Sequence, residues 1–306
     1  MFKFTIKRLL QAIPVLFIVA SLTFFMIRVA PGGPFSTDKA VSSEVLASIN
    51  EHYGLNKPIL YQYYDYMLSL FQGDLGPSYK YSSRTVNEVI ASSFPVSLEL
   101  GIFAMIFAIV VGIAFGVIAA IKPNSIRDYM SMSVVMVGIC VPAFVLGPVL
   151  IWLFAIKLQW FNVTGWSTVG DMVLPTITLG AIYVANIARL SRGGMLEILS
   201  QDFIRTARAK GLPEKVVIIK HALRGGLLSV VSYLGPAIAG VITGSFVVET
   251  IFQVPGLGRV FVQAAFNRDY TMIVGTVVFY SLLIVILNII VDILQIWLDP
   301  RRSFSQ

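Results

Sequence analysis

Six stretches of this 306-residue chain, each 17 to 27 residues long, contain no Asp, Glu, Lys or Arg. A helix rises about 1.5 Å per residue, so about 20 residues cross a hydrocarbon core of about 30 Å. Charged residues make up 13% of the chain, about half the share of a soluble domain. The sequence therefore predicts an all-α membrane protein with six transmembrane helices. The stretches are Leu9 to Ile27, Leu100 to Ile121, Met130 to Ile156, Met172 to Ala188, Gly225 to Val248 and Tyr270 to Val291.

The basic residues are concentrated in one connection between these spans. Eight of the 23 Lys and Arg residues lie between Arg189 and Arg224, against three acidic residues. Lys and Arg are retained on the cytoplasmic side of membrane proteins, so we expect this connection to be cytoplasmic. Counting spans in both directions then places both termini in the cytoplasm. The net charge of +7 follows from this topology beside anionic lipid, and no nucleic-acid partner is expected.

The first span follows a basic N-terminal segment, as the apolar core of a signal peptide does. Its 19 uncharged residues exceed the usual length of such a core, and no A-x-A-like cleavage site follows. We therefore expect the first span to be retained.

The connection between the first two spans, Pro31 to Pro95, holds seven of the 12 tyrosines. Capping signals predict one helix from Ser43 to Gly54 and a second from Pro58 to Gly73. A third short amphipathic stretch is expected over Arg84 to Ile90. The second helix places three side chains on one face, where they either pack at the membrane interface or contact an external partner or substrate. They are Tyr61, Tyr64 and Leu68.

The basic connection is expected to contain a rigid helix. Asp202 can cap its start, and Gly211 fits the left-handed position after its end. Pro213 then begins another short helix, Glu214 to Leu223. A small apolar face surrounded by arginines suits docking in a protein groove, although amphipathic basic helices also lie on anionic lipid. The main members of that face are Phe203, Ile204 and Ala207.

Several side chains beside or inside the spans are candidates for a gate or pore. Ionisable groups near membrane depth are functional candidates, and Glu99 and Glu249 lie next to uncharged runs, near outer ends where water is within reach. Pro142, Pro148 and Pro236 either accompany close helix packing or create bends that let helices rock. The small-x-x-x-small pairs Gly112/Gly116 and Gly240/Gly244 indicate close packing.

Catalytic patterns are missing from the sequence. It has no G-x-x-x-x-G-K-[ST] phosphate loop, no H-E-x-x-H and no G-x-S-x-G. His52 and His221 are expected on opposite sides of the membrane, and the single cysteine, Cys140, allows no intramolecular disulfide. We expect a non-catalytic chain that binds no metal or cofactor.

The basic connection also carries a resemblance. Phe203-Ile-Arg-Thr-Ala-Arg-Ala-Lys-Gly-Leu-Pro, followed by Lys220-His-Ala-Leu-Arg, resembles the cytoplasmic signature loop of binding-protein-dependent ABC importer permeases. The consensus of that loop is EAA, three residues, Gly, nine residues and I-x-L-P. Gly211 matches the glycine and Leu223 the leucine. Departures from the consensus are Arg205-Thr-Ala for EAA, His221 for the isoleucine and Arg224 for the proline.

Three further segments are similar to the dipeptide, oligopeptide and nickel branch of this family. They are Gly73-Asp-Leu-Gly-Pro-Ser, Glu249-Thr-Ile-Phe-Gln-Val-Pro-Gly-Leu-Gly-Arg and Asn267-Arg-Asp-Tyr. The N-terminal run from Ala12-Ile-Pro to Arg28-Val-Ala-Pro-Gly-Gly-Pro-Phe most resembles oligopeptide-transporting members of Gram-negative bacteria.

The resemblance implies a fold and a location. The fold is the six-helix type I ABC importer permease, with a large ordered external loop between helices 1 and 2. Residues 1–30 would be the N-terminal tail and first helix, 31–95 a periplasmic loop, and 96–306 the core permease domain with a coupling loop over 189–225. The location would be the bacterial inner membrane.

The resemblance also implies partners. A second related permease subunit, two ATPase subunits that bind ATP and magnesium, and a periplasmic substrate-binding protein would together import oligopeptides. Dipeptides, glutathione or nickel are alternative substrates in the same branch, and an ion-gradient-driven secondary transporter is the alternative from another class. The residues implied to contact the ATPase are Asp202, Phe203, Arg205, Thr206, Ala207, Arg208, Ala209, Lys210, Gly211 and Leu212.

Overall fold

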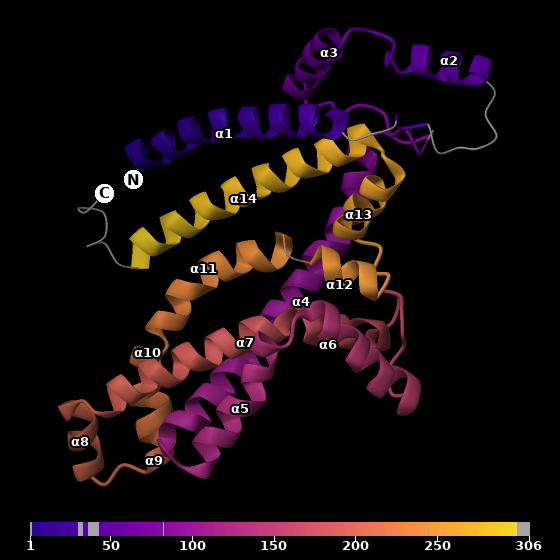
Figure 1. Ribbon diagram of the computed structural model, residues 1–306. Coiled ribbons are helices and arrows are strands. Elements are labelled where there is room, and N and C mark those ends of the chain that lie inside the picture. Colours follow the sequence, from indigo (N-terminus) through magenta and orange to yellow (C-terminus); the bar gives the residue numbers. More distant parts are fainter. Residues whose placement is uncertain (1, 30–32, 36–42, 82, 244, 299–306) are drawn as a thin grey trace. The chain divides into compact units, whose positions relative to one another are not determined.

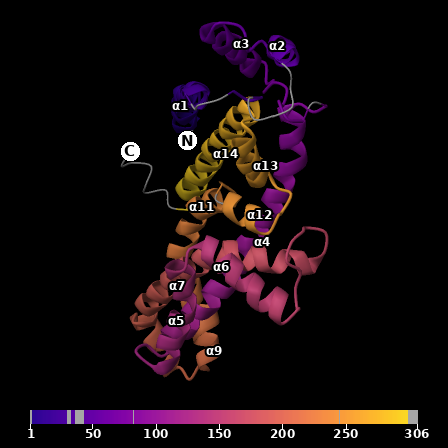
Figure 2. The same cartoon turned by 45° about the vertical axis from the view of Figure 1, so that its right-hand side comes forward.

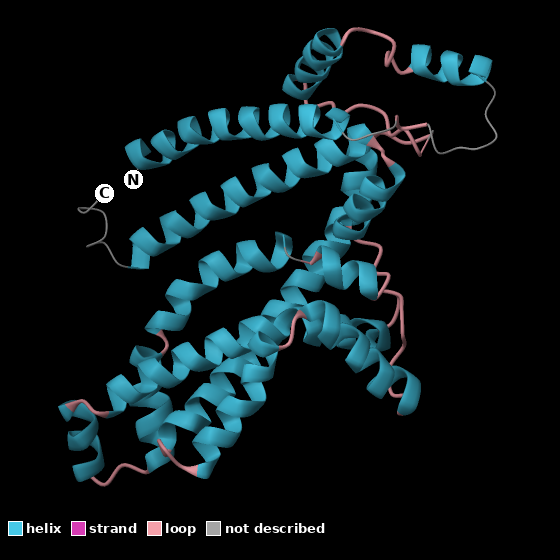
Figure 3. Cartoon of the chain, viewed as in Figure 1, coloured by secondary structure: helices cyan, strands magenta, loops and turns pink. Residues whose placement is uncertain are grey.

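The computed structural model describes residues 2–29, 33–35, 43–81, 83–243 and 245–298. Helices dominate these ranges, which contain no β-strand and one isolated antiparallel bridge between Pro77 and Thr85 (Figure 3). The all-α class is thus confirmed. The first helices are α1 (Phe2–Val29), α2 (Ser43–His52), α3 (Ile59–Phe71), α4 (Val86–Ile121), α5 (Ile126–Cys140) and α6 (Ala143–Leu150) with the π-helical turn η1 (Ile151–Lys157). The others are α7 (Val169–Leu199), α8 (Asp202–Ala209), α9 (Glu214–Val216), the π-helical turn η2 (Val217–Ala222), α10 (Leu223–Gly226), α11 (Leu228–Thr243), α12 (Phe246–Ile251), α13 (Leu257–Asn267) and α14 (Tyr270–Leu298).

Five helical segments are long and apolar enough to cross a membrane, and a broken pair is the sixth candidate. The pair, Ile126–Cys140 and Ala143–Lys157, bends by 111°. The third uncharged run, expected as one helix, is therefore two, because Pro142 lacks the N–H that would continue α5. The five are Leu10–Val29, Val86–Ile121, Val169–Leu199, Leu228–Ile251 and Tyr270–Val291.

The chain forms two compact units, to both of which α4 contributes. Unit 1 comprises residues 1–96 and 256–293, and unit 2 comprises residues 97–255 and 294–306. In unit 2, α5, α10 and α11 pack on α7, and Figures 1 and 2 show α5 alongside α7. The core of unit 2 between these helices contains Ala108, Val135, Val184, Ala185, Ile187, Ala188 and Val230.

Glycines let the helices of unit 2 approach α7 closely. A Cβ on Gly112 of α4 would lie 2.8 Å from the Ile187 side chain, and one on Gly116 would lie 2.5 Å from the carbonyl oxygen of Ala188. A Cβ on Gly138 of α5 would collide with the Ala181 carbonyl. The close packing expected at Gly112 and Gly116 is therefore confirmed.

Of the second expected pair, Gly240/Gly244, the structure describes only Gly240. A Cβ on Gly240 of α11 would lie 3.0 Å from the Tyr183 hydroxyl of α7, so this helix also approaches α7 closely. Gly244 lies outside the described residues.

In unit 1, α1 and α14 run side by side (Figures 1 and 2), and α3 packs against them. The two expected helices of the first connection are confirmed as α2 and α3. Gly54 (φ +64°) and Gly73 (φ +78°) follow them in left-handed conformations that favour glycine. The shared core contains Ala20, Met67, Val274 and Val278.

The third expected helix of that connection is not separate. The stretch predicted over Arg84 to Ile90 forms the first turns of α4, which continues through Pro95 into the second span. A capping box starts this helix: the Thr85 hydroxyl accepts from the Glu88 amide (3.2 Å), and the Glu88 carboxylate accepts from the Thr85 amide (3.0 Å).

Asp269 joins two of the sequence motifs, which lie about 190 residues apart. Its carboxylate is 1% exposed and accepts hydrogen bonds from the Ser78 hydroxyl (2.5 Å) and the Tyr79 amide (3.2 Å). It also accepts from the amides of Lys80 (3.3 Å) and Met272 (3.2 Å). The carboxylate thereby fixes the turn after Gly73-Asp-Leu-Gly-Pro-Ser to the start of α14.

We predict that Gly194→Ala destabilises unit 2 and that its neighbour Gly193→Ala does not. A Cβ at Gly194 would collide with the Gly226 carbonyl of α10, whereas one at Gly193 meets nothing within 4 Å. Overpacking costs about 1–3 kcal/mol, and Ala in place of Gly favours a helix interior by about 0.5–1 kcal/mol. Thermal unfolding of the purified protein in detergent tests this. Equal midpoints for the two variants would contradict the packing described.

We also predict that Asp269→Asn loosens the segment from Ser78 to Tyr81, because an amide cannot accept the same set of hydrogen bonds. A hydrogen bond to a charged group contributes about 1.5–3 kcal/mol. Hydrogen exchange of the amides of Tyr79 and Lys80 should accelerate at least about tenfold. The matched control is Asp74→Asn, because the carboxylate of the exposed Asp74 accepts, within the described residues, only from the Gly76 amide, and an Asn oxygen can replace that acceptor. Unchanged exchange in Asp269→Asn would refute this role.

Candidate functional site

Helix α8 occupies the middle of the basic connection, as expected, but its start differs. Gln201 is the N-cap residue and makes no side-chain capping bond, and Asp202 is the first helical residue. The prediction that Asp202 caps the helix is therefore wrong. The Asp202 carboxylate lies instead near Arg205 Nη1 (3.4 Å). Gly211 follows the helix with φ +77°, which confirms the left-handed position. A Cβ there would meet nothing within 4 Å, so backbone conformation alone favours glycine.

Two of the three apolar side chains expected on the docking face of α8 are buried against other helices of the same chain. Ile204 is 0% exposed and Ala207 is buried, and both pack in a cluster with Ala120 of α4 and Met195 of α7. The expectation that they form a docking face is therefore wrong. The sequence shows which residues of a helix are apolar but not what covers them. Phe203 alone of the three remains available, with 51% of its surface exposed.

The outward face of α8 and the turn after it are polar with a few apolar side chains. Leu212 is exposed beside Gly211, and Phe203 lies at the other end of the helix. The remaining implied contact residues, all exposed, are Asp202, Arg205, Thr206, Arg208, Ala209, Lys210 and Gly211. This surface suits a polar protein groove with apolar contacts at its two ends.

A two-bond ion pair links α8 to the start of α9. The guanidinium of Arg208 donates two hydrogen bonds to the Glu214 carboxylate, at 3.1 and 2.6 Å. These bonds lower the pKa of the Glu214 carboxyl and raise the pKa of Arg208. The pair bridges the turn that contains Gly211 and Pro213.

The second helix of the connection is longer than expected and locally distorted. It begins after Pro213 as expected, but residues Val217–Ala222 form a π-helical turn. The helix then continues through Arg224 to Gly226 as α10. Arg224 stands where the consensus has proline, and its backbone N–H allows the helix to continue. Sequence periodicity could not reveal the π-helical turn.

The candidate gate residues lie on different elements of the chain. Glu99 of α4 is exposed, as expected, and accepts a hydrogen bond from Trp166 Nε1 (2.9 Å). Glu249 of α12 is 0% exposed and accepts from the Ser245 hydroxyl, so its expected access to water is wrong. Pro142 lies at the 111° bend, whereas Pro236 lies inside the continuous helix α11.

An ion pair that the sequence did not reveal anchors α5 to α7. The Arg192 guanidinium donates two hydrogen bonds of 2.7 Å to the buried Asp128 carboxylate, which also accepts from the Asn124 amide (2.9 Å).

Within the described ranges, no group of three or more His, Cys, Asp or Glu side chains could hold a metal ion.

Among solved structures, the chain is similar in fold to the protein titled "Crystal structure of an amino acid ABC transporter with histidines". The TM-score is 0.54 at 14% identity, over 68% of this chain and 93% of that one.

Residues 112–304 match the family described as "Binding-protein-dependent transport system inner membrane component", and residues 1–101 match the family of its N-terminal region. The chain is 48% identical over 306 residues to the oligopeptide transport system permease protein OppB of Salmonella typhimurium, covering 99% of this chain and all of the relative. It is 42% identical to the dipeptide transport system permease protein DppB of Bacillus subtilis, covering 98% of each. This chain therefore belongs to the binding-protein-dependent transport system inner membrane component family, as a non-catalytic, multi-pass membrane subunit.

Proposed function

We propose that this chain, with a second related permease subunit, forms the translocation path of an ATP-driven importer for oligopeptides delivered by a substrate-binding protein. Full-length similarity to relatives named as oligopeptide permeases supports this substrate class. Relatives named as dipeptide permeases are 42% and 38% identical, which makes dipeptides the alternative substrate.

The observation that carries the proposal is the anchoring of α8. Ile204 packs against residues of α4 and α7, and the Arg208–Glu214 pair fixes the following turn. A force on the exposed face of α8 would therefore pass to two candidate spans through packed side chains. We propose that two ATPase subunits, which bind ATP and magnesium, apply this force on closing.

The proposed topology has six spans of the type I importer permease fold, with the broken α5–α6 pair as the third. Both termini and the coupling loop 189–225 face the cytoplasm. Residues 31–95, with α2 and α3, form the periplasmic loop, after the N-terminal tail and first helix in residues 1–30. Residues 96–306 form the core permease domain.

We propose that a gate lies near Glu249 and the α5–α6 bend. A buried carboxylate next to a span and a broken helix are typical of transport paths. Glu249 and Pro142 are the main proposed gate residues, with Glu99 and Pro236 as further residues of the path.

Changes to the exposed face of α8 should impair ATPase coupling without unfolding the chain. Phe203→Ala and Arg205→Glu should each weaken ATPase retention about 5- to 30-fold, because central contacts of an interface contribute about 1–2 kcal/mol. Co-purification of the ATPase subunits with the tagged chain measures this. Lys122→Ala, an exposed residue of another connection on the same proposed side, is the control. Full ATPase retention by both α8 variants would refute the docking role.

The proposed topology predicts opposite labelling of two engineered cysteines. The only native cysteine, Cys140, is exposed and is first replaced by Ser. In right-side-out membrane vesicles, an impermeant maleimide should label Tyr64→Cys in α3 and should label Lys210→Cys only after permeabilisation. Both positions are exposed. Labelling of Lys210→Cys in intact vesicles would contradict the proposed cytoplasmic location of the coupling loop.

A further inference from the structure

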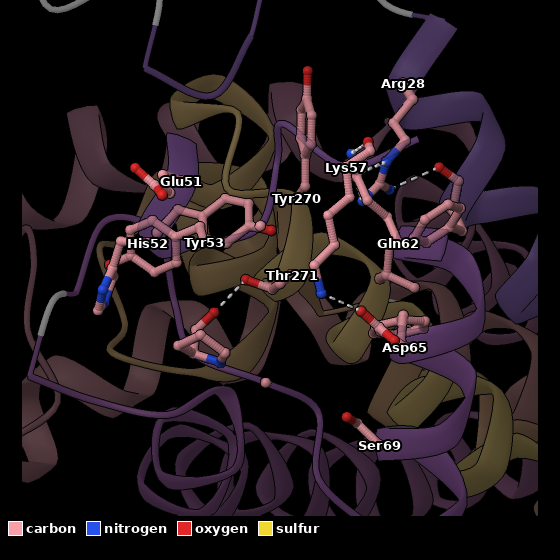
Figure 4. A pocket seen from close by; sticks show the side chains of 17 residues that line it. Arg28, Glu51, His52, Tyr53, Lys57, Gln62, Asp65, Ser69, Tyr270 and Thr271 are labelled. Atoms are coloured by element: carbon pink, nitrogen blue, oxygen red, sulfur yellow. Dashed lines mark hydrogen bonds and ion pairs between the residues drawn. The ribbon is translucent and has the colours of Figure 1, made fainter. Parts of the chain in front are cut away.

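Unit 1 contains a cavity of about 340 Å³ that none of the expected site residues lines (Figure 4). Its wall comes from the end of α1, the α2–α3 connection, α3, the turn at Gly76 and the start of α14. Binding sites for small molecules usually measure about 300–1,000 Å³, so the cavity has the size of a site for one or two amino-acid residues.

Arg28 supplies a positive charge to this cavity. Its Nη1 donates to the Phe24 carbonyl (3.1 Å), and its Nε and Nη2 donate to Gln62 Oε1 (3.4 and 3.2 Å). The guanidinium carbon also lies 3.4 Å from the centre of the Phe24 ring and 5.6 Å from that of Tyr270. No carboxylate in the described part of the chain pairs with it, and two of its five N–H groups remain available. A partly buried guanidinium of this kind favours an anion.

Gln62 holds Arg28 without neutralising it. Its Nε2 donates to the carbonyls of Leu55 (3.1 Å) and Lys57 (2.8 Å), which orients Oε1 toward the guanidinium. Because the acceptor is a neutral amide, the positive charge of Arg28 is not neutralised and can pair with an anionic ligand. Lys57, in contrast, is already paired with Asp65 at 2.8 Å.

Tyr66 supplies a second donor. Its hydroxyl is buried and has no hydrogen-bond partner among the described residues, although it belongs to a residue that lines the cavity. Buried hydroxyls are almost always hydrogen-bonded. Burial raises the pKa of Tyr66, and it raises the pKa of Tyr79 to about 12, in each case against the opposing charge of Arg28. Both side chains are therefore protonated donors at neutral pH.

The charges of the cavity favour a carboxylate of a zwitterion over a phosphate. Asp65 is paired with Lys57, but Glu51 also lines the cavity, so a multiply charged phosphate would be repelled while an ammonium group would be attracted. Tyr53, Tyr79 and Tyr270 supply aromatic surface for an apolar side chain.

We propose that this cavity binds the carboxylate end of a short peptide, with Arg28 as its ionic partner and Tyr66 as its second hydrogen-bond donor. This inference rests on the proposed function, and it assigns to the α2–α3 connection a role in holding substrate.

The test uses the complex of the chain with its partner permease and ATPase subunits in phosphatidylcholine nanodiscs, without the binding protein. Radiolabelled trialanine should bind at least about tenfold more tightly than trialanine amide, because the amide lacks the charge that pairs with Arg28. Arg28→Gln should abolish this difference, and Gln62→Glu should do the same by placing a carboxylate on the guanidinium. Tyr66→Phe should weaken trialanine binding about 3- to 10-fold.

The matched control is Tyr64→Phe, because Tyr64 lies on the same helix but does not line the cavity. Size-exclusion chromatography checks assembly; if Arg28→Gln fails to assemble, Tyr66→Phe and Gln62→Glu decide. Equal binding of acid and amide by the wild-type complex would overturn the inference. A second result would also overturn it: in phosphatidylglycerol nanodiscs, trialanine no longer binds, and the wild-type complex retains this lipid while Arg28→Gln does not. That result would assign the site to a lipid headgroup.

Failure of this inference can be told from failure of the proposed function. ATP-dependent peptide import by a complex that binds acid and amide equally would overturn only the cavity assignment. Discrimination between acid and amide by a complex that imports peptide without ATP would overturn only the proposed energy source.

Discussion

The close approach of helices to α7 is the constraint on which unit 2 depends. Gly112 and Gly116 of α4, Gly138 of α5 and the Gly194–Gly226 contact with α10 each bring a backbone to a distance that a side chain would prevent. In a membrane the apolar effect gives helices no preference for one another over lipid, so such packing contributes much of their association. Because α7 also ends next to α8, the same packing positions the proposed ATPase contact.

Two ion pairs add to this packing in unit 2. The Arg192–Asp128 pair fixes the start of α5 on α7, and the Arg208–Glu214 pair fixes the turn after α8. Between them, Ile204 and Ala207 attach α8 to the ends of α4 and α7. We expect a helix anchored in this way to move together with the spans on which it packs. This arrangement gives a physical reason for a rigid helix at a position where a flexible linker would satisfy the topology.

Apart from the capping by Asp202, the sequence predicted most features set by local chemistry, and it predicted the close packing at Gly112 and Gly116, but it missed several features set by burial. Uncharged runs located the spans, and Gly54, Gly73 and Gly211 marked helix ends because only their backbone conformation matters. The docking face of α8 was wrong because burial of Ile204 depends on helices that lie far away in the sequence. The same holds for the burial of Glu249 and for the cavity around Arg28, whose wall comes from segments separated by about 240 residues.

Uptake of radiolabelled trialanine into proteoliposomes tests most directly whether this chain serves an ATP-driven importer. The liposomes contain the chain, its partner permease and the ATPase subunits, with the binding protein on the outside. We expect uptake that requires ATP and magnesium inside the liposomes and persists when a protonophore dissipates the proton gradient. Uptake that is lost with the proton gradient and is indifferent to ATP would contradict the account and favour a secondary transporter.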